Sequence, residues 1–214
     1  MLVLRCRSFS AALVLCLLWL AALPAWAGNN VVIKTPILES HFYRTTKEPL
    51  YVKYLLYKGG GDCDRGSQKF RNDRPEILTA TEKDYAKSGY DQGHLANAED
   101  FASDCGKQKL TFVFCNALPQ TPNLNRGVWK RYETSIRKWS QSDRLVVICG
   151  GYRFRKVGQL YVPTNCFKVV QNQATGKILF CGTFTNTNKA TETDLTEPVL
   201  EKTLGYRLPI LRKS

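Results

Sequence analysis

The sequence predicts an α+β fold in which a central antiparallel sheet is flanked by helices, and three observations support this prediction. Apolar residues recur every three or four positions from 124 to 139, which is the period of an amphipathic helix. Runs rich in β-branched and aromatic residues follow at 144–149, 160–170 and 177–184. A similar run at 50–57 precedes the helix. Strands on both sides of one clear helix are typical of an α+β chain.

The N-terminal residues have the pattern of an export signal and are set aside from the fold. Two arginines precede an apolar run at 11–23, which is followed within a few residues by the triplet Ala-Trp-Ala. That run is shorter than a membrane-spanning helix, which needs about 20 residues, and no later stretch is apolar enough to span. We therefore expect a signal peptide at 1–27, a single domain at 28–214, and a secreted or periplasmic protein with no membrane partner.

The remaining elements follow from local composition. The run LYVKYLLY at 50–57 leads into three glycines, as a strand entering a flexible loop does. The polar segment 62–87 has no sustained period and is expected to be irregular. The run LTFVFC at 110–115 is interpreted as a buried strand that delivers Asn116 at its end. A short helix is expected at 196–204.

The helix at 124–139 is the clearest helical element, and Asn123 is a candidate for its N-cap. Its apolar stripe is formed by Leu124, Val128, Tyr132, Ile136 and Trp139.

The chain is strongly basic, with 31 lysines and arginines against 18 acidic residues and a formal net charge of +13. The predicted leader removes two of the arginines and no acidic residue, so the remainder stays basic. Such a charge attracts polyanions, which include nucleic acid, acidic polysaccharide and anionic membrane surfaces. Charge alone does not choose among these partners.

Six of the eight cysteines follow the leader, and an even number in an exported chain favours disulfides. A zinc site is the alternative, but the chain has no C-x-x-C pair and its only histidines are His41 and His94. The run CFKVVQ-NQAT-GKILFC is symmetric about its centre, which predicts a hairpin that pairs Cys166 with Cys181. The other pairings stay open. The six cysteines are Cys63, Cys105, Cys115, Cys149, Cys166 and Cys181.

Two segments, DQGHLANAEDF at 91–101 and NALPQTPNLNRGVWKRYE at 116–133, carry a family resemblance. Together they resemble the ββα-metal (His-Me finger) DNA/RNA non-specific endonucleases. The family's first motif is Asp-Arg-Gly-His, and its second places Asn, Pro-Gln, Leu-Asn, Trp and Glu in this order. The matching residues are Asp91, Gly93, His94, Asn116, Pro119, Gln120, Leu124, Asn125, Trp129 and Glu133.

The resemblance implies a ββα-metal nuclease fold and a role for each matching residue. His94 is implied to be the general base, which suits a side chain that accepts protons near neutral pH. Asn125 is implied to be the only direct protein ligand of a divalent metal, with Mg²⁺ expected and Mn²⁺ as the alternative. Asn116 is implied to orient His94 and the nearby backbone.

Two further residues of the helix keep an alternative. Glu133 lies eight residues after Asn125, a spacing that disfavours direct ligation of one ion by both, so we expect Glu133 to hold a metal-bound water. Its alternative is an exposed ion-pair partner of Lys130 or Arg137. For Trp129, core packing competes with base stacking. His41 has no such context and is interpreted as structural.

The chain departs from the family at Gln92, which stands where the family usually has arginine. An uncharged glutamine cannot supply positive charge to the reacting phosphate. Arg71 and Arg74 are the candidates to compensate as active-site cations, with Lys69 as a third. If no cation compensates, replacing Gln92 by arginine raises the cleavage rate.

The sequence therefore favours a secreted, metal-dependent endonuclease that grips the phosphate backbone of DNA and RNA without reading bases. A non-catalytic secreted protein that binds nucleic acid or another polyanion on the same fold is the alternative, and Gln92 is the residue that supports it. A disulfide-stapled structural or membrane-active protein would explain the charge and cysteines but not the two motifs. The oligomeric state, including a dimer, stays open.

Overall fold

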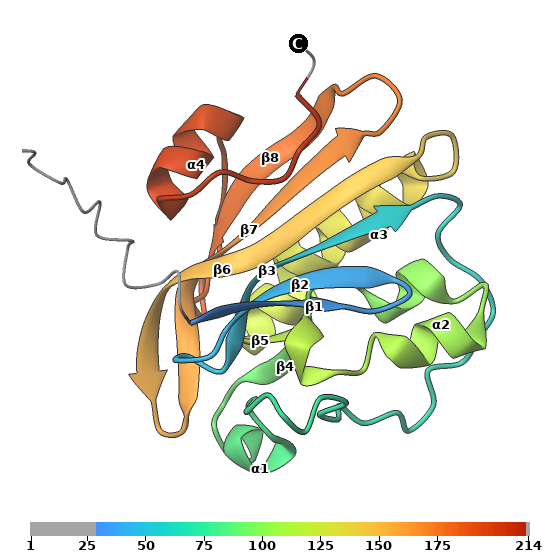
Figure 1. Cartoon of the computed structure of the whole chain (residues 1–214). Helices are drawn as coiled ribbons and strands as arrows, with labels where there is room; N and C mark the ends of the chain where they lie inside the picture. The colour runs from blue at the N-terminus through green and yellow to red at the C-terminus, as the bar shows by residue number, and fades with distance from the viewer. Residues whose placement is uncertain (1–28, 213–214) are drawn as a thin grey trace, which may run out of the picture.

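A seven-stranded antiparallel sheet forms the centre of the protein (Figure 1). The computed structural model describes residues 29–212, so the predicted leader at 1–27 lies outside the described residues. The strand order is β1-β2-β3-β6-β7-β8-β9, which places β3 and β6 side by side although 88 residues lie between them in the chain. The strands are β1 (Asn30–Lys34), β2 (Leu38–Tyr43), β3 (Glu48–Leu56), β6 (Leu145–Val157), β7 (Leu160–Asn172), β8 (Ile178–Thr185) and β9 (Glu192–Asp194). The α+β fold and the four predicted strands at β3, β6, β7 and β8 are confirmed.

The two faces of the sheet carry separate cores, because side chains alternate along each strand. On β6, Val147 and Cys149 pack with Ile136 of the long helix, whereas Val146 and Ile148 pack under the C-terminal helix. These helices are α3 (Lys130–Trp139) and α4 (Glu197–Leu204), and they cover opposite faces of the sheet (Figure 1). The predicted helix at 196–204 is confirmed as α4.

A second, two-stranded sheet lies on the α3 side and leads directly into that helix. Strand β4 (Asp91–His94) pairs antiparallel with β5 (Ala117–Gln120), so that His94 is opposite Ala117. The chain then enters the helix, which gives the ββα unit that the two motifs predict. The shorter elements around it are α1 (Glu82–Tyr85), the 3₁₀ turns η1 (Ala98–Phe101) and η2 (Phe114–Asn116), and α2 (Cys105–Leu110).

The predicted amphipathic helix is present, but its first part is not a regular α-helix. Residues Leu124–Trp129 form a π-helical segment, η3, in which Gly127 has the non-helical angles φ −101° and ψ −111°. Asn123 is not the N-cap, because its backbone is already helical and its side chain donates to the Asn188 carbonyl. Thr121 takes this role, since its hydroxyl accepts from the Leu124 amide at 3.3 Å.

The predicted strand at 110–115 is wrong. Leu110 ends α2, and Phe114 begins the turn η2, with a single bridge between Arg71 and Val113 as the β-like contact. Phe112, Val113 and Phe114 are buried, so the apolar run indicated burial correctly and conformation incorrectly. A short apolar run cannot distinguish a strand from a buried turn. The predicted irregular course of 62–87 is confirmed except for α1.

The predicted disulfide between Cys166 and Cys181 is also wrong. The hairpin has another register, in which Cys166 is opposite Phe184 and Cys181 is opposite Val169. The resulting three-residue offset puts the two thiols on opposite faces of the sheet. Among the described residues the one disulfide joins Cys63 to Cys105, and the other four cysteines are buried thiols.

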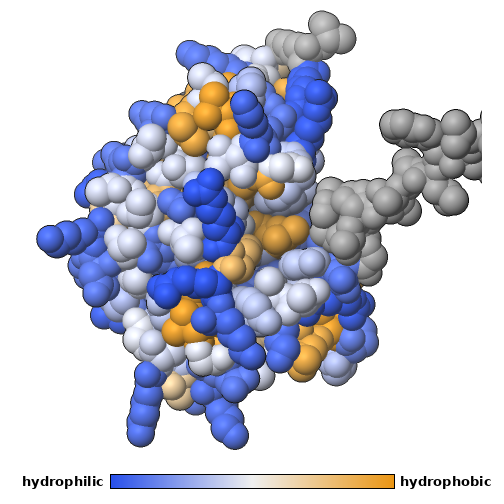
Figure 2. All heavy atoms as spheres, turned by 90° about the vertical axis from the view of Figure 1, so that its left-hand side faces the viewer, coloured by the Kyte–Doolittle hydropathy of each residue, from blue (hydrophilic) through white to orange (hydrophobic). Residues whose placement is uncertain are grey.

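The surface is mainly hydrophilic on the face that lies on the left of Figure 1. Figure 2 shows long hydrophilic side chains over most of this face, with hydrophobic side chains in small separate groups. Within residues 29–212, no helix combines the length and apolar character needed to cross a bilayer.

We expect the Cys63–Cys105 disulfide to raise the free energy of unfolding substantially. It closes a loop with a sequence separation of 42, for which chain entropy predicts about 4 kcal/mol. The double variant Cys63→Ala/Cys105→Ala should therefore show a lower free energy of unfolding in urea. Adding reductant should lower the stability of the native protein and leave that of the variant unchanged. Equal stability of the two oxidised proteins would contradict this assignment.

Candidate active site

A cleft of about 820 Å³ lies where β4, η1 and the π-helical segment meet the irregular segment that follows Gly61. Three of the predicted site residues, His94, Asn125 and Glu133, line this cleft together with Gln92. Asn116, Arg71 and Arg74 do not line it. The remaining lining residues are Arg65, Gln68, Phe70, Asp91, Asn97, Glu99, Phe112, Arg126, Lys130 and Arg137.

The His94 imidazole is held between two aromatic rings in the wall of the cleft. Its ring centre lies 4.5 Å from that of Phe70 and 4.8 Å from that of Phe112, the latter edge-on. The side chain is 7% exposed, and its Nε2 has no hydrogen-bond partner among the described residues. Burial, followed by the nearby Arg65 guanidinium, lowers the pKa of His94 to about 3. The imidazole is therefore neutral at physiological pH and free to accept a proton.

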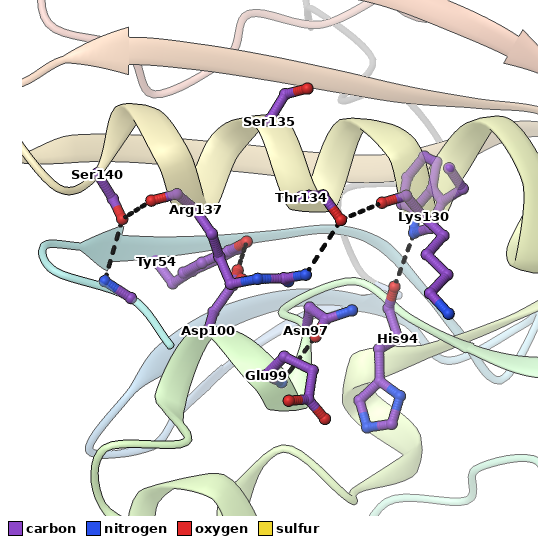
Figure 3. A network of polar contacts seen from close by, with 12 residues as sticks. Tyr54, His94, Asn97, Glu99, Asp100, Lys130, Thr134, Ser135, Arg137 and Ser140 are labelled. Atoms are coloured by element: carbon purple, nitrogen blue, oxygen red, sulfur yellow. Dashed lines mark hydrogen bonds and ion pairs between the residues drawn. The ribbon is translucent and has the colours of Figure 1, made fainter. Parts of the chain in front are cut away.

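Two features hold the His94 backbone in position. The indole Nε1 of Trp129 donates to the His94 carbonyl at 3.1 Å. Figure 3 shows this carbonyl directed toward the helix and the imidazole directed away from it. A Cβ on Gly93 would lie 2.1 Å from Gln120 Oε1, so glycine lets β5 pack closely against β4. Trp129 is fully buried, so the core-packing alternative holds for it and base stacking does not.

Asn116 fastens the chain just after the base. It is fully buried, its Oδ1 accepts from the Ala96 amide at 2.8 Å, and its Nδ2 donates to the Ala96 and Thr111 carbonyls, each at 2.9 Å. Its own carbonyl accepts from the Leu95 amide at 2.9 Å. These contacts give Asn116 a positioning role toward the backbone next to His94.

Asp91 orients the proposed metal ligand. Its carboxylate accepts from Asn125 Nδ2 at 2.9 Å and from the Arg126 guanidinium at 2.8 and 2.7 Å. Because the amide nitrogen is used in this way, the Asn125 oxygen is left as an acceptor in the cleft. Asp91 belongs to the first motif, but its contact with the second motif could not be predicted from the sequence.

The residues present fit a hard divalent cation that keeps most of its water. Within residues 29–212 no group of three or more His, Cys, Asp or Glu side chains forms a metal cluster. A cation at Asn125 would have one neutral oxygen ligand, so water and phosphate oxygens would complete its shell.

Glu133 lies at the base of the cleft and is buried. Its exposed fraction of 7% contradicts the alternative of an exposed ion-pair partner. Arg137 instead pairs with Asp100, with 3.0 Å between Nη1 and Oδ1, and Asp100 also accepts from the Tyr54 hydroxyl (Figure 3). Burial raises the pKa of Glu133, and the Lys168 ammonium is the main group that acts against this rise.

The structure does not bring the predicted cations to the cleft. Arg71 Nη1 donates to the Lys109 carbonyl at 3.2 Å, and Arg74 Nη2 donates to the Lys34 carbonyl at 3.2 Å. Lys69 lies 4.0 Å from Glu82. The cations that line the cleft are Arg65, Arg126, Lys130 and Arg137.

Arg65 is the residue that sequence reasoning missed, because it lies in an irregular segment that carries neither a period nor a motif. The one available signal was its neighbour Cys63, whose disulfide to Cys105 and whose carbonyl bond from Gln108 hold the segment beside α2. The pairing of these cysteines could not be read from the sequence.

Comparison with known proteins identifies relatives of this chain. The profile of the family described as DNA/RNA non-specific endonuclease matches residues 24–201. Human mitochondrial endonuclease G is 32% identical over 134 residues, which cover 54% of this chain and 45% of that protein. The mitochondrial nuclease EXOG of Danio rerio is 31% identical over 131 residues, which cover 53% of this chain and 38% of that protein. The chain thus spans half or less of the length of these curated relatives.

A solved structure shares the fold. The structure described as the EndoG/EndoGI complex, which addresses the mechanism of EndoG inhibition, superposes with a TM-score of 0.67 at 22% sequence identity. The superposition covers 81% of this chain and 83% of that one.

We expect His94 to make the protein less stable in acid. Its pKa in the folded protein is lowered, so between about pH 6.5 and 3 the unfolded chain binds a proton that the folded protein excludes. Each pH unit in this window should lower the free energy of unfolding by up to about 1.4 kcal/mol. Urea unfolding at a series of pH values measures this. The variant His94→Phe should lose this part of the slope, and parallel curves for the two proteins would contradict the prediction.

Proposed function

We propose that this chain, which belongs to the DNA/RNA non-specific endonuclease family, is a secreted sequence-nonspecific endonuclease that hydrolyses phosphodiester bonds of DNA and RNA. The observation that carries the proposal is the meeting of a neutral buried imidazole, His94, with the free amide oxygen of Asn125 in one basic cleft. Secretion is inferred from the leader pattern at 1–27.

His94 acts as the general base in this proposal. Hydrolysis requires removal of a proton from the attacking water, and a neutral imidazole can accept it. The rings of Phe70 and Phe112 pack against the imidazole, while Trp129 bonds the His94 carbonyl and Asn116 bonds the Ala96 backbone just after it. The lowered pKa keeps the base unprotonated over a wide pH range, at the expense of intrinsic basicity.

Asn125 would hold the divalent cation, with Mg²⁺ expected and Mn²⁺ as the alternative. Such an ion supplies positive charge to the scissile phosphate and the leaving oxygen. Asp91 keeps the Asn125 amide oriented, and Glu133 would accept a hydrogen bond from water held by the ion.

The basic residues explain binding without base recognition. Arg65, Lys130 and Arg137 face the cleft and meet phosphate groups, which carry no sequence information. Shallow depressions continue from the cleft over Arg126 and Arg131 to Lys189, on the loop between β8 and β9. A strand longer than the reacting dinucleotide can therefore follow positive charge away from the scissile bond.

The alternative is a non-catalytic binder of nucleic acid or another polyanion on the same fold. Gln92 favoured it, because an active-site arginine is missing at that position. Arg65 weakens this argument, since it lines the same cleft as Gln92 and lies close enough to His94 to lower the pKa of the imidazole.

A plasmid-nicking assay on the oxidised protein tests the proposal. We expect supercoiled DNA to become nicked, linear and then fragmented with Mg²⁺, and to stay intact with EDTA. His94→Ala should lower the rate by about 100-fold or more because the general base is lost. His41→Ala is the matched control, since His41 lies outside the cleft and bonds Glu39, and it should cut normally. Retardation of DNA without cutting under several divalent ions would favour the binder.

A second assay tests whether Arg65 replaces the family arginine. Arg65→Gln should lower kcat/KM by roughly 100-fold, because a cation that stabilises charge on the phosphate is removed. Placing Gln92→Arg in the Arg65→Gln background should restore part of the rate. Arg74→Gln serves as the control and should leave the rate unchanged, since Arg74 contacts Lys34 away from the cleft. Equal rates for Arg65→Gln and the unaltered protein would refute the compensation.

A further inference from the structure

Lys168 is a lysine in the interior of the protein with no hydrogen-bond partner for its Nζ among the described residues. It lies on β7 opposite Cys149 of β6, with an exposed fraction of 0%. Burial of an unpaired ammonium costs several kcal/mol unless opposite charge or a polarisable group compensates. The surroundings of Lys168 therefore have to supply that compensation, and they include residues that hold or line the cleft.

One neighbour is the indole of Trp129, whose ring centre lies 3.5 Å from Lys168 Nζ. A cation over an aromatic face is attracted to the ring electrons, most strongly in a dry site. It draws electron density from the indole and so strengthens the Nε1–H as a donor. That donor is the group that holds the His94 carbonyl at 3.1 Å.

Lys168 also acts electrostatically on two buried carboxylates, Glu133 and Asp100, and its Nζ forms no hydrogen bond with either. Charged or titratable groups face Glu133 from four elements: Lys168 from β7, Cys149 from β6, Asp100 from η1, and Arg137 from its own helix. Arg137 forms a direct ion pair with Asp100, and the Tyr54 hydroxyl donates a hydrogen bond to the same carboxylate. Among the groups that lower the pKa of Glu133, Lys168 has the largest effect, and Arg137, which also lowers it, is bonded directly to Asp100.

We propose that Lys168 is a positioning residue for the cleft, whose buried ammonium keeps the Glu133 carboxylate negatively charged and, through the Trp129 indole, fixes the end of β4 that carries His94. Lys168 touches neither substrate nor water in the cleft, because it lies behind Trp129 and Glu133 and does not line the cleft. The catalytic importance of Glu133 and His94 rests on the proposed nuclease function. The effect of the Lys168 charge on Glu133 does not depend on that function.

The first test uses the metal-free protein, so it does not depend on activity. Side-chain ¹³C NMR follows the Glu133 carboxyl during a pH titration, with Glu133→Gln to assign the signal. In the native protein we expect Glu133 to be ionised at pH 7 in spite of its burial. In Lys168→Met the titration midpoint should rise by roughly 1 to 3 pH units, because the opposite charge is gone. A native midpoint above 7, or the same midpoint in both proteins, would overturn the proposal.

The second test is the pH profile of DNA cleavage. In Lys168→Met the acidic limb should move to higher pH, and the variant should need a higher Mg²⁺ concentration for half-maximal rate. In a Glu133→Gln background, Lys168→Met should move the limb no further, because the two residues act through one charge. Lys177→Met is the matched control, since Lys177 is an exposed lysine in the turn after the same strand. An equal shift in Lys177→Met would attribute the change to net charge and overturn the proposal.

The two tests separate this inference from the proposed function. If the native protein cuts nothing while the Glu133 midpoint rises in Lys168→Met, the charge balance is supported and the nuclease proposal fails. If the native protein cuts DNA and the midpoint does not move, the nuclease proposal stands and the inference about Lys168 fails.

Discussion

The hydrogen bond from Trp129 Nε1 to the His94 carbonyl is the contact on which the geometry of the cleft depends. A buried indole N–H has one donor and needs an acceptor, and Trp129 is fully buried against Phe184 with 5.4 Å between ring centres. Because the acceptor is the last carbonyl of β4, the helix cannot slide along the strand without losing this bond. The base on the strand and the candidate ligand Asn125 on the helix are thereby held in one frame.

The π-helical segment makes a second contribution to this frame. Successive side chains of a regular α-helix point about 100° apart, so Asn125 and Arg126 would tend to face different surroundings. In the wider π-helical turn before Gly127, both reach the carboxylate of Asp91. Asp91 of the first motif therefore orients the Asn125 amide and holds the Arg126 guanidinium beside it. Irregular helical turns of this type are frequent at functional sites, and here the irregularity has a direct chemical consequence.

The sequence was informative where one physical pattern determined the outcome. The helical period identified the face with Leu124 and Ile136, and the two motifs brought His94, Asn125 and Glu133 into one cleft. Prediction failed where contacts between residues far apart in the sequence determine the structure. The hairpin register depends on the turn, where the Asn172 amide bonds the Lys177 carbonyl, and on a bulge beside Val170, and the symmetric cysteine run revealed neither. Arg65 reaches the cleft by an irregular path, which tertiary contacts determine and local composition does not.

That irregular path shows how an element with few internal hydrogen bonds can serve an ordered site. The segment carries both Arg65 and Phe70 to His94, and it is anchored at two points. The disulfide at Cys63 fixes its start, and Arg71 exchanges backbone bonds of 3.1 and 3.0 Å with the Phe112 and Phe114 positions. Arg71 thus supports the site through its backbone, although its side chain was the one predicted to act as an active-site cation.

The anchoring also connects the cleft with the redox state of the surroundings. Reduction of the Cys63–Cys105 bond would leave the start of the segment held only by the hydrogen bonds of the Cys63 backbone, whereas Phe70 would keep the adjacent Arg71 bridge, so Arg65 would be loosened more than Phe70. The position of the Arg65 charge is therefore more sensitive to reduction than the packing of Phe70 against His94. An oxidising environment is therefore the one in which this arrangement is complete.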